Sequence, residues 1–198
     1  VGLIAGIEPL TERVFQATPT LKVVSRCGAG LDSVDLNAAQ DHGVAVLNTP
    51  EAPAQAVAEL TMGLMLSLLR QINQIDQAVR KGEWPRLQGR LLAAQTVGII
   101  GIGHIGRRVA RLCQAFEAKV IAHDPFAAQV PQGVTLMPLE KLLASADIIT
   151  LHLPYTPQTH HLLDRKAFAS LKSEAIIINA ARGGLIDECA LAEALNSG

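Results

Sequence analysis

Aromatic side chains are scarce in this sequence: Phe, Trp and Tyr together make up 3% of the 198 residues, although 49% of the residues are hydrophobic. Any core must therefore be aliphatic, which is typical of a parallel sheet covered by helices rich in Ala and Leu. An excess of one charge is missing too. The 17 basic and 18 acidic side chains leave a net charge of -1, so no field draws the chain to nucleic acid or to an anionic membrane.

Cysteine and long apolar runs are also rare. Cys27, Cys113 and Cys189 are an odd number of cysteines without the spacing of metal ligands. We therefore predict that they are reduced and packed, in a cytoplasmic protein without a metal site. The longest apolar stretch, residues 56–69, contains polar residues and is too short to span a bilayer. Because Val1 lies in a strand pattern already under way and Gly198 directly follows a helical pattern, we expect a piece of a longer protein.

A glycine-rich stretch follows a short apolar run over 97–100. The β-branched residues of that run predict a strand buried on both faces. Gly101, Gly103 and Gly106 then fit the pattern G-x-G-x-x-G. In this pattern the first glycine permits a tight turn, the second lets a pyrophosphate approach the backbone, and the third lets the helix pack closely on the strand. Alone, the pattern is also compatible with an ordinary strand-to-helix turn.

The residues after the glycines complete a dinucleotide-binding pattern. A predicted helix over 105–116 leads to a predicted strand over 119–123, and Asp124 follows eighteen residues after Gly106. An acid at the end of the second strand accepts hydrogen bonds from the adenosine ribose. The sequence therefore predicts a dinucleotide site, and Asp124 favours NAD because its carboxylate would repel a 2′-phosphate.

Strands and helices alternate on both sides of this stretch, which predicts parallel sheets in an α/β protein. We expect a partial small domain over 1–52 and a doubly wound domain over 53–198, whose four strands have the spatial order 3-2-1-4. The expected strands are 3–5, 22–25, 43–47, 97–100, 119–123, 147–153 and 175–179. The expected helices are 12–17, 36–41, 54–80, 105–116, 138–145, 164–170 and 187–197. Asp32 or Ser33 is expected to cap the helix over 36–41, and Asp187 the last helix.

The segment 54–80 is apolar nearly all round. A helix of this kind is buried in a large core or in a subunit interface. We therefore expect a homodimer through this segment.

The proposed strand order makes the first and fourth strands neighbours, so the loop over 180–184 would face the glycine turn. Arg182 stands there between small residues, and its planar fork could pair with a carboxylate or polarise a carbonyl. The alternative is an arginine that only caps a helix or pairs with Asp187 or Glu188. The histidines are less informative: His152 is interpreted as structural and the pair at 160–161 as solvated, since none of the six has an evident carboxylate partner.

These motifs together resemble the D-2-hydroxyacid dehydrogenase family, most closely its phosphoglycerate dehydrogenase branch. The resemblance covers essentially the whole chain and is carried by residues 26–35, 57–61, 101–106, 123–125, 151–154 and 179–188. It implies a Rossmann NAD-binding domain and part of a smaller flavodoxin-like substrate-binding domain. It also implies hydride transfer between NAD and a small D-2-hydroxy acid or 2-keto acid, with 3-phosphoglycerate and serine biosynthesis as the first expectation.

The resemblance assigns roles residue by residue. Arg182 would be the catalytic arginine, and Arg26, Ala29 and Gly30 would bind the substrate. The cofactor-binding residues would be Gly101, Gly103, His104, Ile105, Gly106, Asp124, Pro125, Leu153, Pro154, Ala180, Ala181 and Arg182. The family's proton-transferring histidine and its partner acid come later than Gly198, so we expect no turnover from residues 1–198 alone.

The sequence departs from the family in places. Glu117 and Glu174 stand where turn glycines are usual. Residues 5–7 read Ala-Gly-Ile where the phosphoglycerate enzymes tend to carry an arginine for the substrate phosphate. A hydroxypyruvate or glyoxylate reductase therefore stays open, as does an NAD(H)-sensing binding protein similar to the dehydrogenase-related co-repressors.

Overall fold

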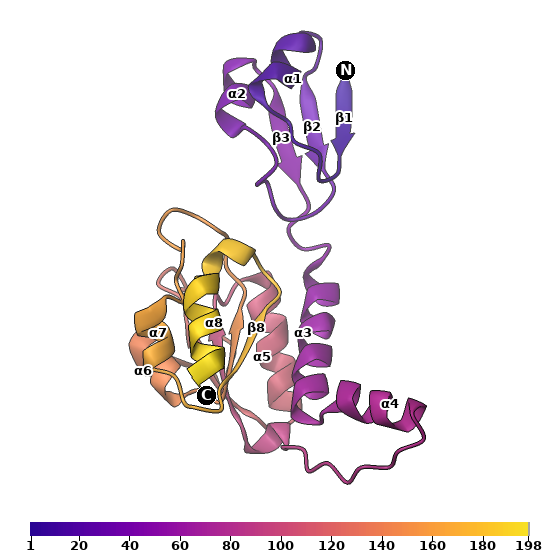
Figure 1. Cartoon of the computed structure of the whole chain (residues 1–198). Helices are drawn as coiled ribbons and strands as arrows, with labels where there is room; N and C mark the ends of the chain where they lie inside the picture. The colour runs from indigo at the N-terminus through magenta and orange to yellow at the C-terminus, as the bar shows by residue number, and fades with distance from the viewer. Residues whose placement is uncertain (198) are drawn as a thin grey trace. The chain divides into compact units, whose positions relative to one another are not determined.

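The computed structural model describes residues 1–197. The chain divides between Gln55 and Ala56 into two compact units, each with a sheet of its own (Figure 1).

The first unit is a small parallel sheet covered by helices on one face. Its strands β1 (Gly2–Ala5), β2 (Val23–Arg26) and β3 (Ala45–Asn48) lie side by side in that order, and its helices are α1 (Glu12–Ala17) and α2 (Leu36–Asp41). Phe15 of α1, Ala39 of α2 and Val24 of β2 share one buried cluster. The opposite face of the sheet is open, with Ile4 82% and Leu47 57% exposed. The three strands and two helices expected from the sequence are confirmed.

The cap of α2 differs from the expectation. Asp35, rather than Asp32 or Ser33, accepts a hydrogen bond from the backbone N–H of Ala38, at 3.0 Å. The helix begins at Leu36, and an N-cap side chain reaches N–H groups two or three residues ahead, so only Asp35 has the right spacing.

The second unit is built on a five-stranded parallel sheet in the order β6-β5-β4-β7-β8. The strands are β4 (Thr96–Ile100), β5 (Lys119–His123), β6 (Thr135–Leu136), β7 (Ile148–Leu151) and β8 (Ile176–Asn179). The expected order 3-2-1-4 put the strand over 147–153 (β7) at the edge of the sheet, next to β5, and this is wrong. The strand next to β5 at that edge is β6, which was not predicted from the sequence. The direct neighbour of β4 is therefore β7, and β8 lies one strand further away.

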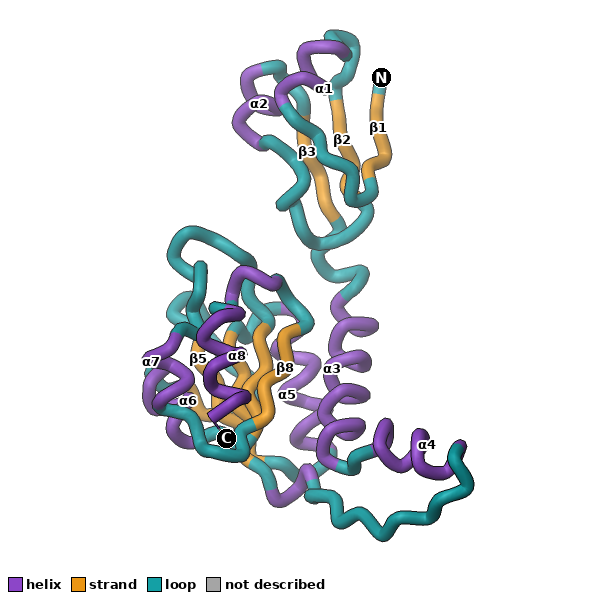
Figure 2. Tube along the Cα trace, in the orientation of Figure 1, coloured by secondary structure: helices purple, strands orange, loops and turns teal. Residues whose placement is uncertain are grey.

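Helices cover both faces of this sheet, as a doubly wound fold requires (Figure 2). Helices α3 (Ala54–Leu69) and α5 (His104–Ala115) pack on one face, and α6 (Leu139–Ser145), α7 (Arg165–Ala169) and α8 (Glu188–Ser197) on the other. Short 3-10 turns, η1 (Leu92–Ala94) and η2 (Gly183–Leu185), precede β4 and α8. Alternate residues of β4 point to the two layers: Val97 and Ile99 join the first cluster and Ile100 the second. The predicted strand buried on both faces is confirmed.

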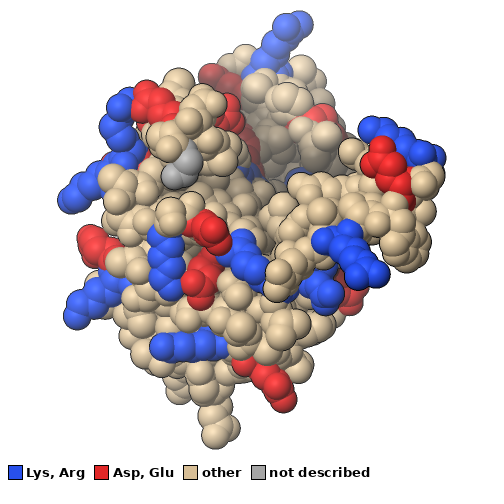
Figure 3. Space-filling view, turned by 60° about the horizontal axis from the view of Figure 1, so that its bottom comes forward, with Lys and Arg blue, Asp and Glu red and all other residues tan. Residues whose placement is uncertain are grey.

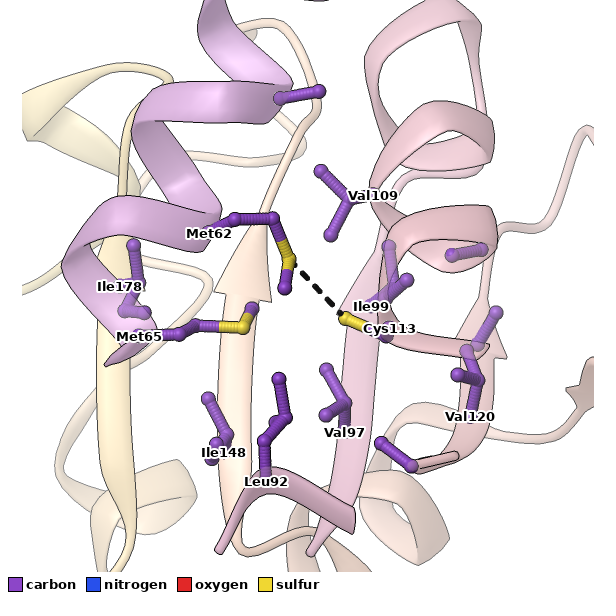
Figure 4. Packing of buried hydrophobic residues seen from close by; sticks show 14 of the residues in the cluster. Met62, Met65, Leu92, Val97, Ile99, Val109, Cys113, Val120, Ile148 and Ile178 are labelled. Carbon is purple, nitrogen blue, oxygen red and sulfur yellow. Dashed lines mark hydrogen bonds between the residues drawn. The ribbon is translucent and has the colours of Figure 1, made fainter. Parts of the chain in front are cut away.

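The first apolar layer brings α3 and α5 together. Met62 of α3 and Cys113 of α5 meet there with their sulfur atoms 3.7 Å apart (Figure 4). Burial raises the pKa of the Cys113 thiol to about 12, so it is a packed, protonated side chain at neutral pH. Cys27 and Cys189 are exposed. The prediction that all three cysteines are packed is therefore wrong for these two, which lie in a loop and on the outer side of α8.

The segment 54–80 forms two helices rather than one. Helix α3 ends at Leu69, and α4 (Ile72–Arg80) starts after Gln71, which has the left-handed φ of 52°. A residue in this conformation ends a helix, and the usual sequence signal for it is a glycine. The outward face of α3 stays apolar: Leu60, Leu64 and Leu68 are 56%, 40% and 52% exposed.

Another left-handed residue ends α5. Glu117 has a φ of 62° and follows Phe116, the C-cap of the helix. Among residues 1–197, Glu174 is not one of the non-glycine residues with positive φ. The two glutamates that stand in place of family glycines therefore differ in backbone conformation.

No helix among the described residues has the length and the apolar character needed to cross a membrane. Basic and acidic side chains lie interspersed on the surface seen in Figure 3, as the net charge of -1 leads one to expect.

Candidate functional site

The glycine turn at the end of β4 is tightly packed except at its middle glycine. Gly101 has a φ of 91°, and a Cβ there would lie 2.4 Å from the carbonyl oxygen of His152. A Cβ on Gly106 would lie 2.1 Å from the carbonyl oxygen of Gly101. A Cβ on Gly103 would meet nothing within 4 Å. Two glycines are thus required by the protein's own packing, whereas Gly103 leaves open space.

The open space lies at the start of α5. Gly103 is the N-cap of this helix and has no side chain to cap the first N–H groups, which belong to residues such as His104 and Ile105. An uncapped helix N-terminus with a glycine backbone beside it is suited to an anion such as a pyrophosphate. The arrangement of the three glycines therefore fits a dinucleotide phosphate.

Asp124 lies beside this turn. One carboxylate oxygen accepts a hydrogen bond from the N–H of Ile102 at 2.9 Å, and the other from the N–H of Phe126 at 2.9 Å. A carboxylate has about four lone-pair sites, so each oxygen keeps one for a ribose hydroxyl. Pro125 next to it is exposed.

The loop after β7 borders the glycine turn on the other side. The N–H of His152 donates to the carbonyl of Ile100 at 2.8 Å, which joins the ends of β7 and β4. Leu153 is half-buried and Pro154 is exposed, and the Pro154 carbonyl accepts a hydrogen bond from the Thr159 hydroxyl at 2.9 Å. The loop after β7 and the segment after β5 thus both contact the glycine turn directly.

The ring of His152 is buried beneath this loop. Its Nε2 and the buried Thr150 hydroxyl are 2.9 Å apart, and its Nδ1 is buried without a hydrogen-bond partner. Burial lowers the pKa of His152 to about 4, so the ring is neutral at pH 7.

The loop after β8 carries the candidate catalytic arginine. Asn179 braces this loop: its side-chain amide donates to the carbonyl of Arg182 at 2.7 Å and accepts from the N–H of Ala181 at 3.0 Å. The exposed Arg182 guanidinium donates to the Ala181 carbonyl at 2.9 Å. Gly184 packs under Tyr155, so that a Cβ there would lie 2.6 Å from the ring. The Arg182 loop therefore contacts the loop after β7. The expected strand order made the strand before Arg182 a direct neighbour of β4, whereas β7 lies between the two.

A row of interacting side chains, which the sequence did not predict, begins at Tyr155 beside this contact between the two loops. The Tyr155 hydroxyl and Nδ1 of His160 are 3.0 Å apart, and the His160 ring stacks on His161 at 3.7 Å between centroids. His161 Nδ1 lies 4.0 Å from a carboxylate oxygen of Asp187. Asp187 also caps α8 through the N–H groups of Cys189 and Ala190, as predicted. The expectation that no histidine has a carboxylate partner is thus wrong for His161, because the two residues are distant in sequence.

The first unit carries its own loop of interest after β2. The N–H of Gly28 donates to the Thr49 hydroxyl at 3.0 Å, and the Asn48 side chain donates to the Ala29 carbonyl at 2.8 Å. Arg26 donates to the Cys27 carbonyl. Within residues 1–197, the N–H groups of Ala29 and Gly30 donate to no protein acceptor. A pair of free N–H groups on a braced loop is suited to a carboxylate.

Among the residues that the structure describes, no group of three or more His, Cys, Asp or Glu side chains is arranged to hold a metal ion.

The second unit thus has the architecture of a dinucleotide-binding α/β domain. A glycine turn, the Asp124 carboxylate and the exposed Arg182 lie at one edge of its sheet. Residues 62–198 match the family model described as "D-isomer specific 2-hydroxyacid dehydrogenase, NAD binding domain". The chain belongs to the D-isomer specific 2-hydroxyacid dehydrogenases.

Individual relatives cover nearly the whole chain. It is 44% identical over 195 residues to a D-3-phosphoglycerate dehydrogenase of Methanocaldococcus jannaschii, covering 96% of this chain and 37% of that protein. It is 42% identical over 200 residues to a hydroxypyruvate reductase of Thermotoga maritima, covering 100% and 65%. The solved D-lactate dehydrogenase of Aquifex aeolicus, complexed with NAD and lactic acid, superposes with a TM-score of 0.91 at 31% identity, covering 100% of this chain and 61% of that one. The chain thus spans less than two thirds of the length of these relatives.

Proposed function

We propose that the full-length protein is an NAD-dependent dehydrogenase that transfers a hydride between NAD and a small D-2-hydroxy acid. One observation carries the proposal: the glycine turn with Asp124 and the loop with Arg182 lie at the carboxyl edge of one sheet, on either side of the β7 loop. Ligands of open α/β sheets bind at this edge. NAD, when bound, supplies the hydride acceptor, and the protein supplies binding and orientation.

The cofactor roles follow from position along this edge. The pyrophosphate would lie over the glycine turn, and Asp124 and Pro125 would contact the adenosine ribose. The nicotinamide half would lie along the loops after β7 and β8, which contribute Leu153, Pro154, Ala180 and Ala181. Arg182 would hold the carboxylate of the substrate and stabilise the negative charge on its C2 oxygen, since its fork pairs bidentately with such oxygens.

NAD rather than NADP is the proposed cofactor. The Asp124 carboxylate is held by two backbone N–H groups and would face the 2′ position of the ribose, where a phosphate would be repelled. Titration calorimetry of residues 1–198 with each dinucleotide tests this. NAD is expected to bind at least tenfold more tightly than NADP, and equal affinities would contradict the assignment.

The first unit is proposed as part of the substrate-binding domain, with its boundary near residue 52. The braced loop with Arg26, Ala29 and Gly30 would take the substrate carboxylate through its free N–H groups. The cysteines are all free thiols, which supports a cytoplasmic protein.

The first candidate substrate is 3-phosphoglycerate, supported by the D-3-phosphoglycerate dehydrogenase named above. A specific observation favours the second candidate, hydroxypyruvate or glyoxylate. Residues 6–8, which follow β1, carry no basic side chain: Ile7 is 85% exposed, and the Glu8 carboxylate accepts the N–H of Gly6 at 2.8 Å. The nearby Arg26 already acts on the charge of Glu8. Hydrogen bonds from the backbone lower the pKa of Glu8 and keep it negative.

Turnover of the full-length protein with NADH decides between the candidates. The panel is 3-phosphohydroxypyruvate, hydroxypyruvate, glyoxylate and pyruvate, compared by kcat/KM. A preference for the phosphorylated acid supports the first candidate, and a preference for an unphosphorylated acid supports the second. Absence of turnover on all four would overturn the proposed activity.

We further propose that the outward face of α3 pairs two copies of the protein. Leu60, Leu64 and Leu68 form an exposed apolar stripe on this helix, and such stripes mark subunit interfaces. The variant Leu64→Lys is expected to be monomeric by light scattering. Leu195→Lys is the control, because Leu195 is 75% exposed on α8; a dimer that survives Leu64→Lys would sink this proposal.

A further inference from the structure

The backbone of Ile102, between the first two glycines of the turn, is held on both sides by charged groups. Its N–H donates to the Asp124 carboxylate at 2.9 Å, and its carbonyl accepts from Nε of Arg107 at 3.0 Å. The Ile102 side chain is 1% exposed and anchors the same residue in the first apolar layer. The orientation of this part of the turn is therefore set by an acidic residue directly after β5 and a basic residue of α5.

Arg107 makes a second contact that reaches beyond the turn. Its Nη2 donates to the carbonyl of Gln129 at 2.7 Å. Residues 124–129 form the first half of the loop between β5 and β6, and its first turn is closed by the hydrogen bond from Phe126 N–H to Asp124. This half of the loop is thus held at its start through Asp124 and at Gln129 by Arg107, and both Asp124 and Arg107 also bind the backbone of Ile102.

We propose that Arg107 is a positioning residue for the dinucleotide: by joining Ile102 to Gln129 it fixes the Asp124 carboxylate against the glycine turn. This inference rests on the proposed NAD site. The carboxylate that receives the ribose hydroxyls is held by the same backbone that receives the pyrophosphate. With the loop tied down, Asp124 cannot swing away from a 2′-phosphate, so Arg107 also contributes to the preference for NAD over NADP.

A simpler role for Arg107 has to be separated from this one. A cation in the first turn of α5 could attract a pyrophosphate by charge alone. Lysine keeps the charge but has no planar fork that could donate to two carbonyl groups in fixed directions. We call the two hydrogen bonds from Arg107 to the carbonyls of Ile102 and Gln129 the clamp. The variant Arg107→Lys therefore keeps the attraction by charge and loses the clamp.

The chain also offers a matched control. Arg108 is the next residue of the same helix, has the same charge, and donates to the carbonyl of His104 within its own helix, at 2.9 Å. This hydrogen bond stays within α5 and does not reach the loop after β5. Arg108→Lys should thus reproduce the change of side chain without touching the clamp.

The experiment is calorimetric titration of residues 1–198 and of its variants with NAD and with NADP. We expect Arg107→Lys and Arg107→Ala to bind NAD about tenfold more weakly, the loss of about one charge-assisted hydrogen bond, with the affinities for NAD and NADP closer together. Arg108→Lys should keep the wild-type ratio. Wild-type affinity and ratio in Arg107→Lys would overturn the clamp. If the unaltered chain binds neither dinucleotide, the proposed function fails instead.

Amide hydrogen exchange in the absence of cofactor supplies a second measurement. Its result does not depend on any attraction between the charge of residue 107 and a pyrophosphate. The N–H groups of Ile102 and Phe126 should exchange faster in Arg107→Lys than in the wild type, because the loop that carries Asp124 is released. They should be unchanged in Arg108→Lys. Equal protection in all three proteins would contradict the positioning role.

Discussion

Gly106 touches Gly101: the position of a Cβ on Gly106 is 2.1 Å from the carbonyl oxygen of Gly101. The first and third glycines of the turn therefore pack directly against each other. This contact lets the backbone of α5 lie close against the end of β4. The middle glycine takes no part in it.

This difference predicts opposite results for two alanine variants. Gly106→Ala should destabilise the chain by about 2 kcal/mol or more, because the new methyl group has to displace backbone. Gly103→Ala should keep the unfolding free energy within about 0.5 kcal/mol but bind NAD at least tenfold more weakly, since its methyl group would occupy the approach of the pyrophosphate. Urea unfolding and calorimetry check both. Equal stability losses would mean that the glycines do not differ in role.

The left-handed Glu117 predicts a stabilising change. A non-glycine residue in this conformation costs about 1–2 kcal/mol, so Glu117→Gly should raise the unfolding free energy by about 1 kcal/mol. Glu174→Gly is the control and should not stabilise, because Glu174 has no positive φ. Thermal unfolding of the two variants beside the wild type gives the answer; stabilisation of both would refute the conformational explanation.

His152 predicts a loss of stability in mild acid. Burial lowers its pKa to about 4 in the folded chain, whereas an unfolded histidine has a pKa of about 6.5. Below about pH 6.5 the unfolded chain binds the extra proton, so the stability that the neutral ring contributes is complete above that pH and is lost as the pH falls toward 4. The stability gap between the wild type and His152→Gln should therefore narrow from pH 7 to pH 4.5. A gap independent of pH in urea titrations would contradict the buried neutral histidine.

Two further variants separate binding from rate in the full-length enzyme. Asp124→Ala should mainly raise the KM for NAD, because the carboxylate contacts the cofactor. Arg182→Ala should mainly lower kcat, by about a hundredfold or more, since it removes a donor to the oxygen that becomes negative. Arg111→Ala, an exposed arginine on α5, is the control. Equal loss of NAD affinity in the first two variants would count against this division.

Short elements with a clear local pattern were predictable. The strand over 119–123 and the helix over 36–41 have the bounds that the structure gives, because the hydrophobic pattern of a segment is a local property. The order of the strands was not. Strand β6 has two residues and no periodicity, and omitting it moved β7 to the wrong side of β4.

Side-chain contacts between loops were beyond the sequence for a different reason. The Arg182 loop reaches Tyr155, and His161 reaches Asp187, only after β7 and β8 have been placed side by side. The left-handed conformation of Gln71 was likewise not predictable, because its usual sequence signal, a glycine, is missing at this position. Backbone fingerprints can be found in a sequence, whereas pairings of this kind depend on the tertiary arrangement.

The turn after β4 leaves its open space at Gly103, which has no side chain, while the side chain of the preceding Ile102 is buried in the core. Natural selection can therefore exchange the side chains at the two ends of the site, such as Asp124 and Arg182, without changing the surface that would receive the phosphates. Different residues therefore determine the stability of the domain and the choice of its ligand. A lineage with this turn is free to change substrate, and even cofactor, one loop at a time.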